Sequence, residues 1–381
     1  MTRVAILTTD SREHYRDYEN RKPYFGTAPE ALLQGFATLP EIEIHVISCL
    51  QQNVSSPEKL ARNIWYHGLH VPNFGWMKTA YQGCVRAVQK KLKEIQPDIV
   101  HGQGTERDCS VSAVLSGFPN VLTIHGHMRA VAKINQARPF SYGWFAARLE
   151  EMTVPRSQGV VCITNYTRAA VADLARRTWV VPNAVDASFF DLKPAADDLM
   201  TILCVGTISL LKNQNEFIRA LDPLAATQKF RVVFLGAANR NTVYGKEFFQ
   251  LLETRPWCVY EGFANREKLK EYFQRATFLA LPSLEDNCPM VVLESMAAGL
   301  PVIAAKVGGV PDLIEEGKTG FFCNSSSPSD MRAGVAKILE GLPTAREMAA
   351  RAKQCALERF SPSIIARRHL EIYREVLSKS S

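Results

Sequence analysis

Two carboxylates in one short segment are the residues of this sequence best suited to chemistry. Asp286 and Glu294 lie between Leu281 and Pro301, where an apolar run, a polar turn and a helical pattern follow one another. A turn from a strand into a helix presents unbonded backbone N–H groups and the positive end of the helix dipole, which suits a diphosphate. Glu294 falls among apolar residues, where a carboxylate is costly unless paired or liganded. It therefore either accepts hydrogen bonds from a ribose diol, or caps a neighbouring backbone group or pairs with an arginine.

Basic and imidazole side chains supply the other candidates. Lys212 follows the strand-like run TILCVG, and His125 ends the strand-like run VLTIHG. A histidine at the end of a strand can contact a ligand, or it can be a buried structural residue that orients a loop. A lone lysine in a turn is most often simply solvated. His101 and His127 are weaker candidates of the same kind.

Composition limits the classes of protein to which the chain can belong. Its 381 residues exceed one ordinary core, so we expect two domains, and 46% hydrophobic with 22% charged residues is typical of a globular protein. Apolar runs stay shorter than the roughly 18 residues of a membrane span, and the N-terminus lacks the features of a signal peptide. The nine cysteines form no C-x-x-C pair, and we expect free thiols in a reducing cytoplasm. The net charge of +7 is compatible with an anionic ligand or a membrane surface, and no nucleic-acid-binding motif is present.

The elements that must position these residues alternate along the chain. Short apolar runs alternate with helical patterns, which indicates parallel sheets of the doubly wound α/β class. The alternation stops and restarts, so we predict one domain over 1–185, a linker over 186–200 and a second domain over 201–357. The segment 358–381 is predicted as a helix that packs back on the first domain, with Ser361 as its N-cap. Open sheets of this class bind ligands outside the carboxyl ends of their strands.

The carboxylate segment closely resembles the donor-binding signature of retaining glycosyltransferases of the two-domain GT-B fold, specifically glycosyltransferase family 4. The family has an acidic residue, seven intervening residues, a glutamate, then Gly-x-Pro-Val-Ile-Ala and a Gly-Gly-x-Pro-Glu/Asp turn. The matching residues here are Asp286, Glu294, Gly299, Pro301, Val302, Ile303, Ala304, Gly308, Gly309, Pro311, Asp312, Gly317 and Gly320. The chain departs from the family at Asp286, where glutamate is usual, and at Pro289, where glycine is frequent. The fold implied is GT-B, with two Rossmann-like domains that face a cleft.

The resemblance also implies roles for individual residues. Glu294 would hold the donor ribose, Asp286 and His125 would contact the transferred sugar, and Lys212 would bind the diphosphate. The remaining donor-side positions are Gly206, Thr207, Glu285, Asn287, Cys288 and Met290, and the loop near the phosphates and the acceptor contains Gly26 and Thr27. Thr207 stands where the family often has an arginine. Asn183 matches an interdomain motif of the family, and we interpret it as part of a hinge.

The activity implied is transfer of a sugar from a UDP- or GDP-linked donor to a glycan or lipid-linked acceptor, with retention and without a metal or other cofactor. Polysaccharide or glycolipid biosynthesis is the implied context. A sugar-nucleotide epimerase of the same fold and a non-catalytic nucleotide-sugar-binding protein remain alternatives. A dehydrogenase is disfavoured because no G-x-G-x-x-G follows a strand. A basic helix face could dock on an anionic membrane at the cytoplasmic side, or it could simply be solvated; its residues are Arg86, Lys90, Lys91 and Lys93.

Overall fold

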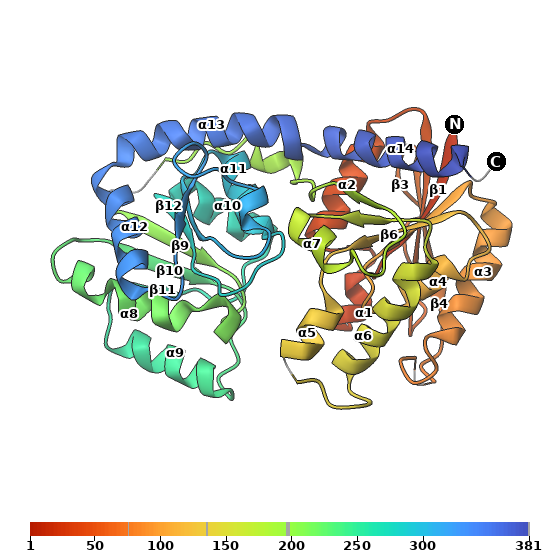
Figure 1. The fold of residues 1–381 in the computed structure, drawn as a ribbon, viewed down its shortest axis with the longest axis horizontal. Coiled ribbons are helices and arrows are strands. Elements are labelled where there is room, and N and C mark those ends of the chain that lie inside the picture. Colours follow the sequence, from red (N-terminus) through yellow and green to blue (C-terminus); the bar gives the residue numbers. More distant parts are fainter. Residues whose placement is uncertain (75, 135, 196–198, 380–381) are drawn as a thin grey trace. The chain divides into compact units, whose positions relative to one another are not determined.

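The computed structural model describes the whole chain except residues 75, 135, 196–198 and 380–381 (Figure 1). The chain forms two compact units. Unit 1 contains Met1–Ala184 together with Ser361–Ser381, and unit 2 contains Val185–Phe360. Most of the predicted linker 186–200 belongs to unit 2, where it includes the 3-10 helix η2 (Ala187–Phe189), while its residues 196–198 lie outside the described part.

Unit 1 is built on an eight-stranded sheet in the order β3-β4-β2-β1-β5-β6-β7-β8. Its strands are β1 (Thr2–Leu7), β2 (Ile42–Leu50), β3 (Lys59–Ala61), β4 (Ile64–His70), β5 (Ile99–Gln103), β6 (Asn120–Ile124), β7 (Val160–Cys162) and β8 (Thr178–Val180). Its helices are α1 (Ser11–Tyr15), α2 (Thr27–Ala37), α3 (Gln82–Ile95), α4 (Asp108–Val114), α5 (Met128–Ile134), α6 (Tyr142–Thr153), η1 (Val154–Arg156), α7 (Asn165–Ala170) and α14 (Pro362–Ser378). All strand pairs are parallel except β3 with β4.

Strands β1, β5, β6 and β7 are buried on both faces of the unit 1 sheet, which explains why they are largely apolar, whereas β3 and much of β4 are partly exposed. In β1, Val4 and Ile6 face the core formed with α2 and α14, whereas Ala5 and Leu7 face the core formed with α3 and α4. Helix α14 lies against α2 in Figure 1. The two helices approach so closely at Gly35 that a Cβ there would lie 2.0 Å from the carbonyl oxygen of Pro362.

Unit 2 is built on a six-stranded parallel sheet in the order β11-β10-β9-β12-β13-β14. Its strands are β9 (Thr201–Val205), β10 (Arg231–Leu235), β11 (Cys258–Tyr260), β12 (Phe278–Leu281), β13 (Val302–Ala305) and β14 (Phe321–Cys323). Its helices, besides η2, are η3 (Leu210–Lys212), α8 (Gln214–Ala225), α9 (Val243–Glu253), α10 (Arg266–Arg275), α11 (Met290–Ala298), η4 (Val310–Asp312), α12 (Pro328–Glu340) and α13 (Leu342–Phe360).

The predicted class of two doubly wound α/β sheets is confirmed. The predicted start of the last helix is also confirmed, because Ser361 is the N-cap of α14 and Pro362 its first residue, although the Ser361 side chain makes no capping hydrogen bond. All nine cysteines lie in the described part as free thiols, and eight of them are buried. Among the described helices, none is long and apolar enough to cross a membrane.

Candidate functional site

The site in unit 2 lies where the strand order reverses. Strands β9 and β12 are neighbours, and the chain leaves them toward opposite edges of the sheet, which is the position where doubly wound folds bind ligands. Lys212 follows β9 and Asp286 follows β12, and the Lys212 Nζ lies 2.5 Å from the Asp286 Oδ2. The Ser283 hydroxyl donates to the same carboxylate oxygen at 3.0 Å. Two residues predicted separately from the sequence therefore form one ion pair at the switch point.

The loop that carries Lys212 is held by the side chain of Gln214, which bonds to backbone groups of the loop. The Gln214 amide donates to the Thr207 carbonyl at 3.1 Å and accepts from the Ser209 N–H at 3.3 Å. Thr207 is exposed, and Gly206 adjoins the aliphatic stem of Lys212. A Cβ on Gly236 would lie 2.1 Å from the Gly206 carbonyl oxygen, so this second strand-end glycine is also required. Gly236 was not predicted from the sequence, although it ends the run FRVVFLG much as Gly206 ends TILCVG.

The Gly308–Gly309 turn supports Asp286 from the neighbouring strand. The Asp286 carbonyl accepts a hydrogen bond from the Gly309 N–H at 3.0 Å. Gly308 adopts a φ of 52°, and a Cβ there would lie 1.9 Å from the same carbonyl oxygen. Any side chain at position 308 would therefore displace the backbone of Asp286.

Glu294 is buried in α11 and pairs with an arginine. Its carboxylate oxygen Oε1 lies 2.5 Å from the Arg266 Nη1, and the residue is 2% exposed. Burial raises the pKa of Glu294, and the nearby Arg266 opposes that rise. Arg266 also lies 3.8 Å from Asp186 and packs over the Phe189 ring at 4.6 Å. The arginine-paired arrangement weighed from the sequence is therefore present, and the ribose role of Glu294 stays a prediction.

The other predicted donor-side residues surround the start of α11. Glu285, Asn287 and Cys288 lie in the loop between β12 and α11, and Met290 is the first residue of the helix. Cys288 is buried, while Glu285, Asn287 and Met290 are half-buried. Pro289 is the N-cap and provides no side-chain hydrogen bond. Arg266, in contrast, was missed by the sequence analysis, since its only signal is its place at the start of a helix after the N-cap Asn265.

A separate group of predicted residues comes together in unit 1. His125 follows β6, and its Nε2 lies 2.8 Å from the Gln103 Oε1 at the end of β5. Burial lowers the pKa of His125 to about 4, so the ring is neutral near pH 7. His125, Ala28 and Asn183 line one small cavity of about 10 Å³. Gly26, two residues before Ala28, adopts a φ of 86° and precedes Thr27, the first residue of α2.

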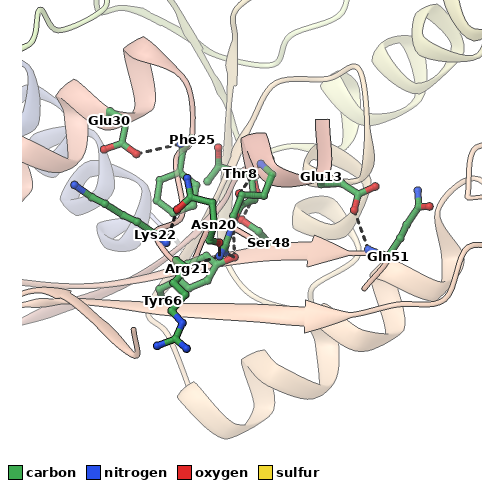
Figure 2. A network of polar contacts seen from close by, with 12 residues as sticks. Thr8, Glu13, Asn20, Arg21, Lys22, Phe25, Glu30, Ser48, Gln51 and Tyr66 are labelled. Atoms are coloured by element: carbon green, nitrogen blue, oxygen red, sulfur yellow. Dashed lines mark hydrogen bonds and ion pairs between the residues drawn. The ribbon is translucent and has the colours of Figure 1, made fainter. Parts of the chain in front are cut away.

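The long segment between β1 and α2 is held in place by hydrogen bonds and ion pairs of buried charged side chains. Arg12 and Asp10 form an ion pair at 2.7 Å with both side chains buried, and the Tyr66 hydroxyl donates to Asp10 at 2.7 Å. The Arg12 guanidinium also donates to the carbonyls of Asn20 and Arg21, at 3.0 and 3.2 Å. Figure 2 shows this part of the molecule, where Glu13, which follows Arg12, accepts from the Gln51 N–H, Phe25 donates to Glu30 and Ser48 donates to Thr8. These contacts therefore fix the conformation of the segment that leads from β1 to Gly26.

Two further features lie apart from these groups. A cavity of about 530 Å³ opens at the carboxyl ends of β13 and β14, where Leu284, Lys306 and Phe322 line it and neither Lys212 nor Glu294 does. In the interior of unit 1, the potential metal-ligand atoms of Cys49, Cys84 and Asp108 lie within 4.8 Å of one another. The sequence spacing of these three residues gave no sign of that cluster.

Two family models match the chain. Glycosyltransferase Family 4 matches residues 31–189, and Glycosyl transferases group 1 matches residues 188–355. An uncharacterized glycosyltransferase of Methanocaldococcus jannaschii is 28% identical over 178 residues, which are 47% of this chain and 45% of that protein. The sulfoquinovosyl transferase of Arabidopsis thaliana is 29% identical over 298 residues, 71% of this chain and 55% of that protein. The chain thus spans about half the length of these two curated relatives.

Solved structures share the fold over the full chain. Sucrose-phosphate synthase from Thermosynechococcus elongatus superposes with a TM-score of 0.78 at 16% identity, covering 100% of both chains. The Anabaena protein HepE in complex with UDP-glucose superposes with a TM-score of 0.71 at 16% identity, covering 98% of this chain and 100% of that one. With both halves of the sequence matched by family models and the architecture matched throughout, the chain belongs to the glycosyltransferases of the family 4 type and has the GT-B fold.

Proposed function

We propose that this protein transfers a sugar from a nucleoside diphosphate sugar to an acceptor hydroxyl. The observation that carries the proposal is the Lys212–Asp286 pair at the switch point between β9 and β12. When the bond between sugar and diphosphate breaks, negative charge grows on the diphosphate and positive charge on the sugar. The pair offers a cation to the leaving group and a carboxylate to the sugar, side by side and already oriented.

Donor binding follows from the same geometry. The start of α11 and the Lys212 ammonium would hold the diphosphate, because helix N-termini and cations both favour anions. Glu294 would accept from a ribose diol while Arg266 keeps its charge balanced. A UDP- or GDP-linked sugar is the proposed donor, and the complex of the Anabaena neighbour with UDP-glucose supports the uridine form.

Retention without a divalent metal is part of the proposal. Lys212 would stabilise the leaving diphosphate in place of a metal ion. The resemblance to retaining family members supports retention. Turnover with UDP-glucose in EDTA should match turnover without it, and proton NMR of the product should show the anomeric configuration of the donor. Reversible loss of activity in EDTA, restored by added metal, would contradict the metal-free part.

The acceptor is proposed to be a glycan or a lipid-linked sugar in polysaccharide or glycolipid synthesis. Unit 1 would take it up, since its residues carry 25 Lys and Arg against 17 Asp and Glu, a net charge of +8. The exposed Arg86, Lys90 and Lys93 of α3 would dock on an anionic membrane at its cytoplasmic face, where a lipid-linked acceptor lies.

A binding screen tests the function directly. Thermal shift with UDP, GDP, ADP, UDP-glucose and GDP-mannose should single out one base, because a ligand at about 100 times its Kd stabilises by about 2.7 kcal/mol. The stabilisation should shrink in Lys212→Ala and persist in Lys229→Ala, which removes an exposed lysine of unit 2. If none of the nucleotides stabilises the protein, the donor site is wrong. Conversion of the donor sugar without an acceptor would identify an epimerase, and binding without hydrolysis or transfer would identify a non-catalytic protein.

A further inference from the structure

A chain of polar side chains runs from the C-terminal helix to His125 through the interior of unit 1. The Tyr373 hydroxyl of α14 lies 2.7 Å from the Nδ1 of His101, and the Nε2 of His101 lies 2.7 Å from the Thr123 hydroxyl. The Gln103 amide nitrogen lies 3.3 and 3.5 Å from the two ring nitrogens of His101. The other end of that amide, its Oε1, lies 2.8 Å from the His125 Nε2.

Every member of this chain behind His125 is buried. His101 and Tyr373 are 0% exposed, Thr123 is 3% exposed and Gln103 is 6% exposed. A buried amide must satisfy both its oxygen and its nitrogen, so its orientation is set by the partners on either side. With the amide nitrogen beside His101, the oxygen is directed at His125. An amide oxygen only accepts, so the neutral His125 ring carries its proton on Nε2.

The space behind His125 leaves little freedom for the ring. The cavity bounded by His125, Gln103 and His369 measures only about 10 Å³, which is too small for a ligand. The side chains around this cavity confine the ring, and its hydrogen bond to Gln103 helps to fix which ring nitrogen carries the proton. Without that bond, the neutral ring would lose one of the contacts that fix its tautomer and its orientation.

We propose that Gln103 is a positioning residue for His125, and that Tyr373 of α14 holds Gln103 in its orientation through His101. The proposal rests on the function proposed above, together with the contact between His125 and the transferred sugar that the family resemblance implies. It extends that function by making the C-terminal helix part of the support of the site. Gln103 itself touches no substrate in this scheme and acts only on the tautomer and direction of the His125 ring.

The first test reads the tautomer without any turnover. Histidine labelled with nitrogen-15 should show His125 as a single Nε2–H tautomer in a long-range proton–nitrogen spectrum, with the signals assigned by His125→Ala. Gln103→Met should mix the two tautomers. Gln158→Met is the matched control, since the Gln158 Oε1 accepts from the Asn120 N–H at 2.7 Å, at the opposite end of the same strand β6. An unchanged His125 tautomer in Gln103→Met would overturn the proposal.

The second test couples Gln103 to His125 by a double-mutant cycle on UDP release from UDP-glucose. Gln103→Met should lower kcat by about 10-fold with little change in KM, the scale of one hydrogen bond. In the His125→Ala background the same substitution should have no further effect. Tyr373→Phe, which removes only the hydroxyl, should lower kcat less than Gln103→Met does and in the same direction. Additive losses would mean that Gln103 acts independently of His125, which contradicts the positioning role.

The two tests separate failure of this inference from failure of the proposed function. If His125→Ala retains full activity while Gln103→Met still mixes the tautomers, then Gln103 positions the ring but the role of His125 at the donor is wrong. If His125→Ala is impaired and Gln103→Met changes neither tautomer nor kcat, the positioning role is wrong and the role of His125 stands.

Discussion

The two units are both doubly wound α/β domains, but they differ in net charge and in the charge of their site residues. Unit 1 carries a net charge of +8 and contains all eight histidines of the chain, whereas unit 2 has 20 Lys and Arg against 21 Asp and Glu and a net charge of −1. Yet the site residues of unit 1 are neutral, since His125 and Gln103 carry no charge near pH 7. The site residues of unit 2 are charged and paired. The net charge of a domain therefore does not reveal the charge of its site.

This difference also separates two ways of holding a site together. In unit 2, Lys212 pairs with Asp286 and Glu294 pairs with Arg266, and removing one partner leaves the desolvation cost of the other charge uncompensated. In unit 1, the site depends on buried rings that must stay uncharged. We therefore expect the two units to respond differently to acid and to substitution, and the following experiments test that expectation.

Acid should act on unit 1 first. Burial lowers the pKa of His369 from 6.5 to about 4, so between these values the unfolded chain binds a proton that the folded unit does not. Stability is therefore lost as the pH falls from 6.5 toward 4, by about 3 kcal/mol for this residue. Hydrogen exchange read by mass spectrometry should show peptides of unit 1 losing protection at pH 4.5 while peptides of unit 2 keep theirs.

A substitution identifies the residue responsible. His369→Met replaces a ring that lies against His101 and Phe36 with an apolar side chain, and it should reduce the pH dependence of exchange in unit 1, to which His125 also contributes. Equal loss of protection in both units, or an unchanged pH dependence in this variant, would contradict the assignment.

Substitution of the paired cation should have the next largest effect. Lys212→Ala removes the charge that meets the leaving diphosphate and leaves Asp286 unpaired, so kcat/KM for UDP-glucose should fall by about 100-fold or more. Lys229→Ala, an exposed lysine on the same unit, should retain wild-type activity. A loss below about 10-fold would show that another group stabilises the diphosphate.

The buried carboxylate should have a smaller effect. Glu294→Gln should lower kcat/KM for UDP-glucose by about 10–100-fold, through the loss of hydrogen bonds to a charged acceptor. A ribose role also predicts that the wild type prefers UDP-glucose over its 2′-deoxyribose analogue and that the variant does not. The matched control is Glu253→Gln, an exposed acid of α9. If Glu294→Gln still prefers UDP-glucose over the 2′-deoxyribose analogue, Glu294 does not bind the ribose and only pairs with Arg266.

The surface charge of unit 1 should have the smallest effect. Each of the exchanges Arg86→Glu and Lys90→Glu should weaken pelleting with phosphatidylserine vesicles by several-fold, since one basic residue contributes about 1 kcal/mol near an anionic surface. Lys229→Glu provides the same charge change on unit 2 and should leave pelleting unaltered. Binding that is equal with neutral and anionic vesicles would remove the membrane surface from the proposal.

Much of the fold could be predicted because it depends on local patterns. Strands β9, β10 and β12 of unit 2 are short apolar runs followed directly by glycine or proline, and the helix after Ser361 carries its start signal in the sequence. The strands β3 and β4 were missed because KLA is too short to show alternation and because IWYHGLH is interrupted by two histidines and a glycine. Strand β4 pairs with β2 and strand β3 pairs with β4, and a local pattern contains neither pairing.

The site was predictable only as a set of separate positions. Asp286 and Glu294 stood out by spacing and Lys212 by its place after a strand, yet their partners come from the fold. Arg266 reaches Glu294 from another helix, and Lys212 meets Asp286 across 74 positions of sequence. Gln103 was not predicted at all, because a single amide at the end of an apolar strand carries no signal until its neighbours are known.

The close approach of α14 to α2 at Gly35 has a consequence for synthesis of the chain. Unit 1 includes β1 and α14, which lie at the two ends of the described chain, and Tyr373 of α14 fills the same core as Val4 of β1. While the ribosome is still translating unit 2, the core around Phe36 lacks its last helix. Unit 2, by contrast, is one continuous stretch of chain, so it can complete its core before unit 1, although unit 1 begins to emerge first.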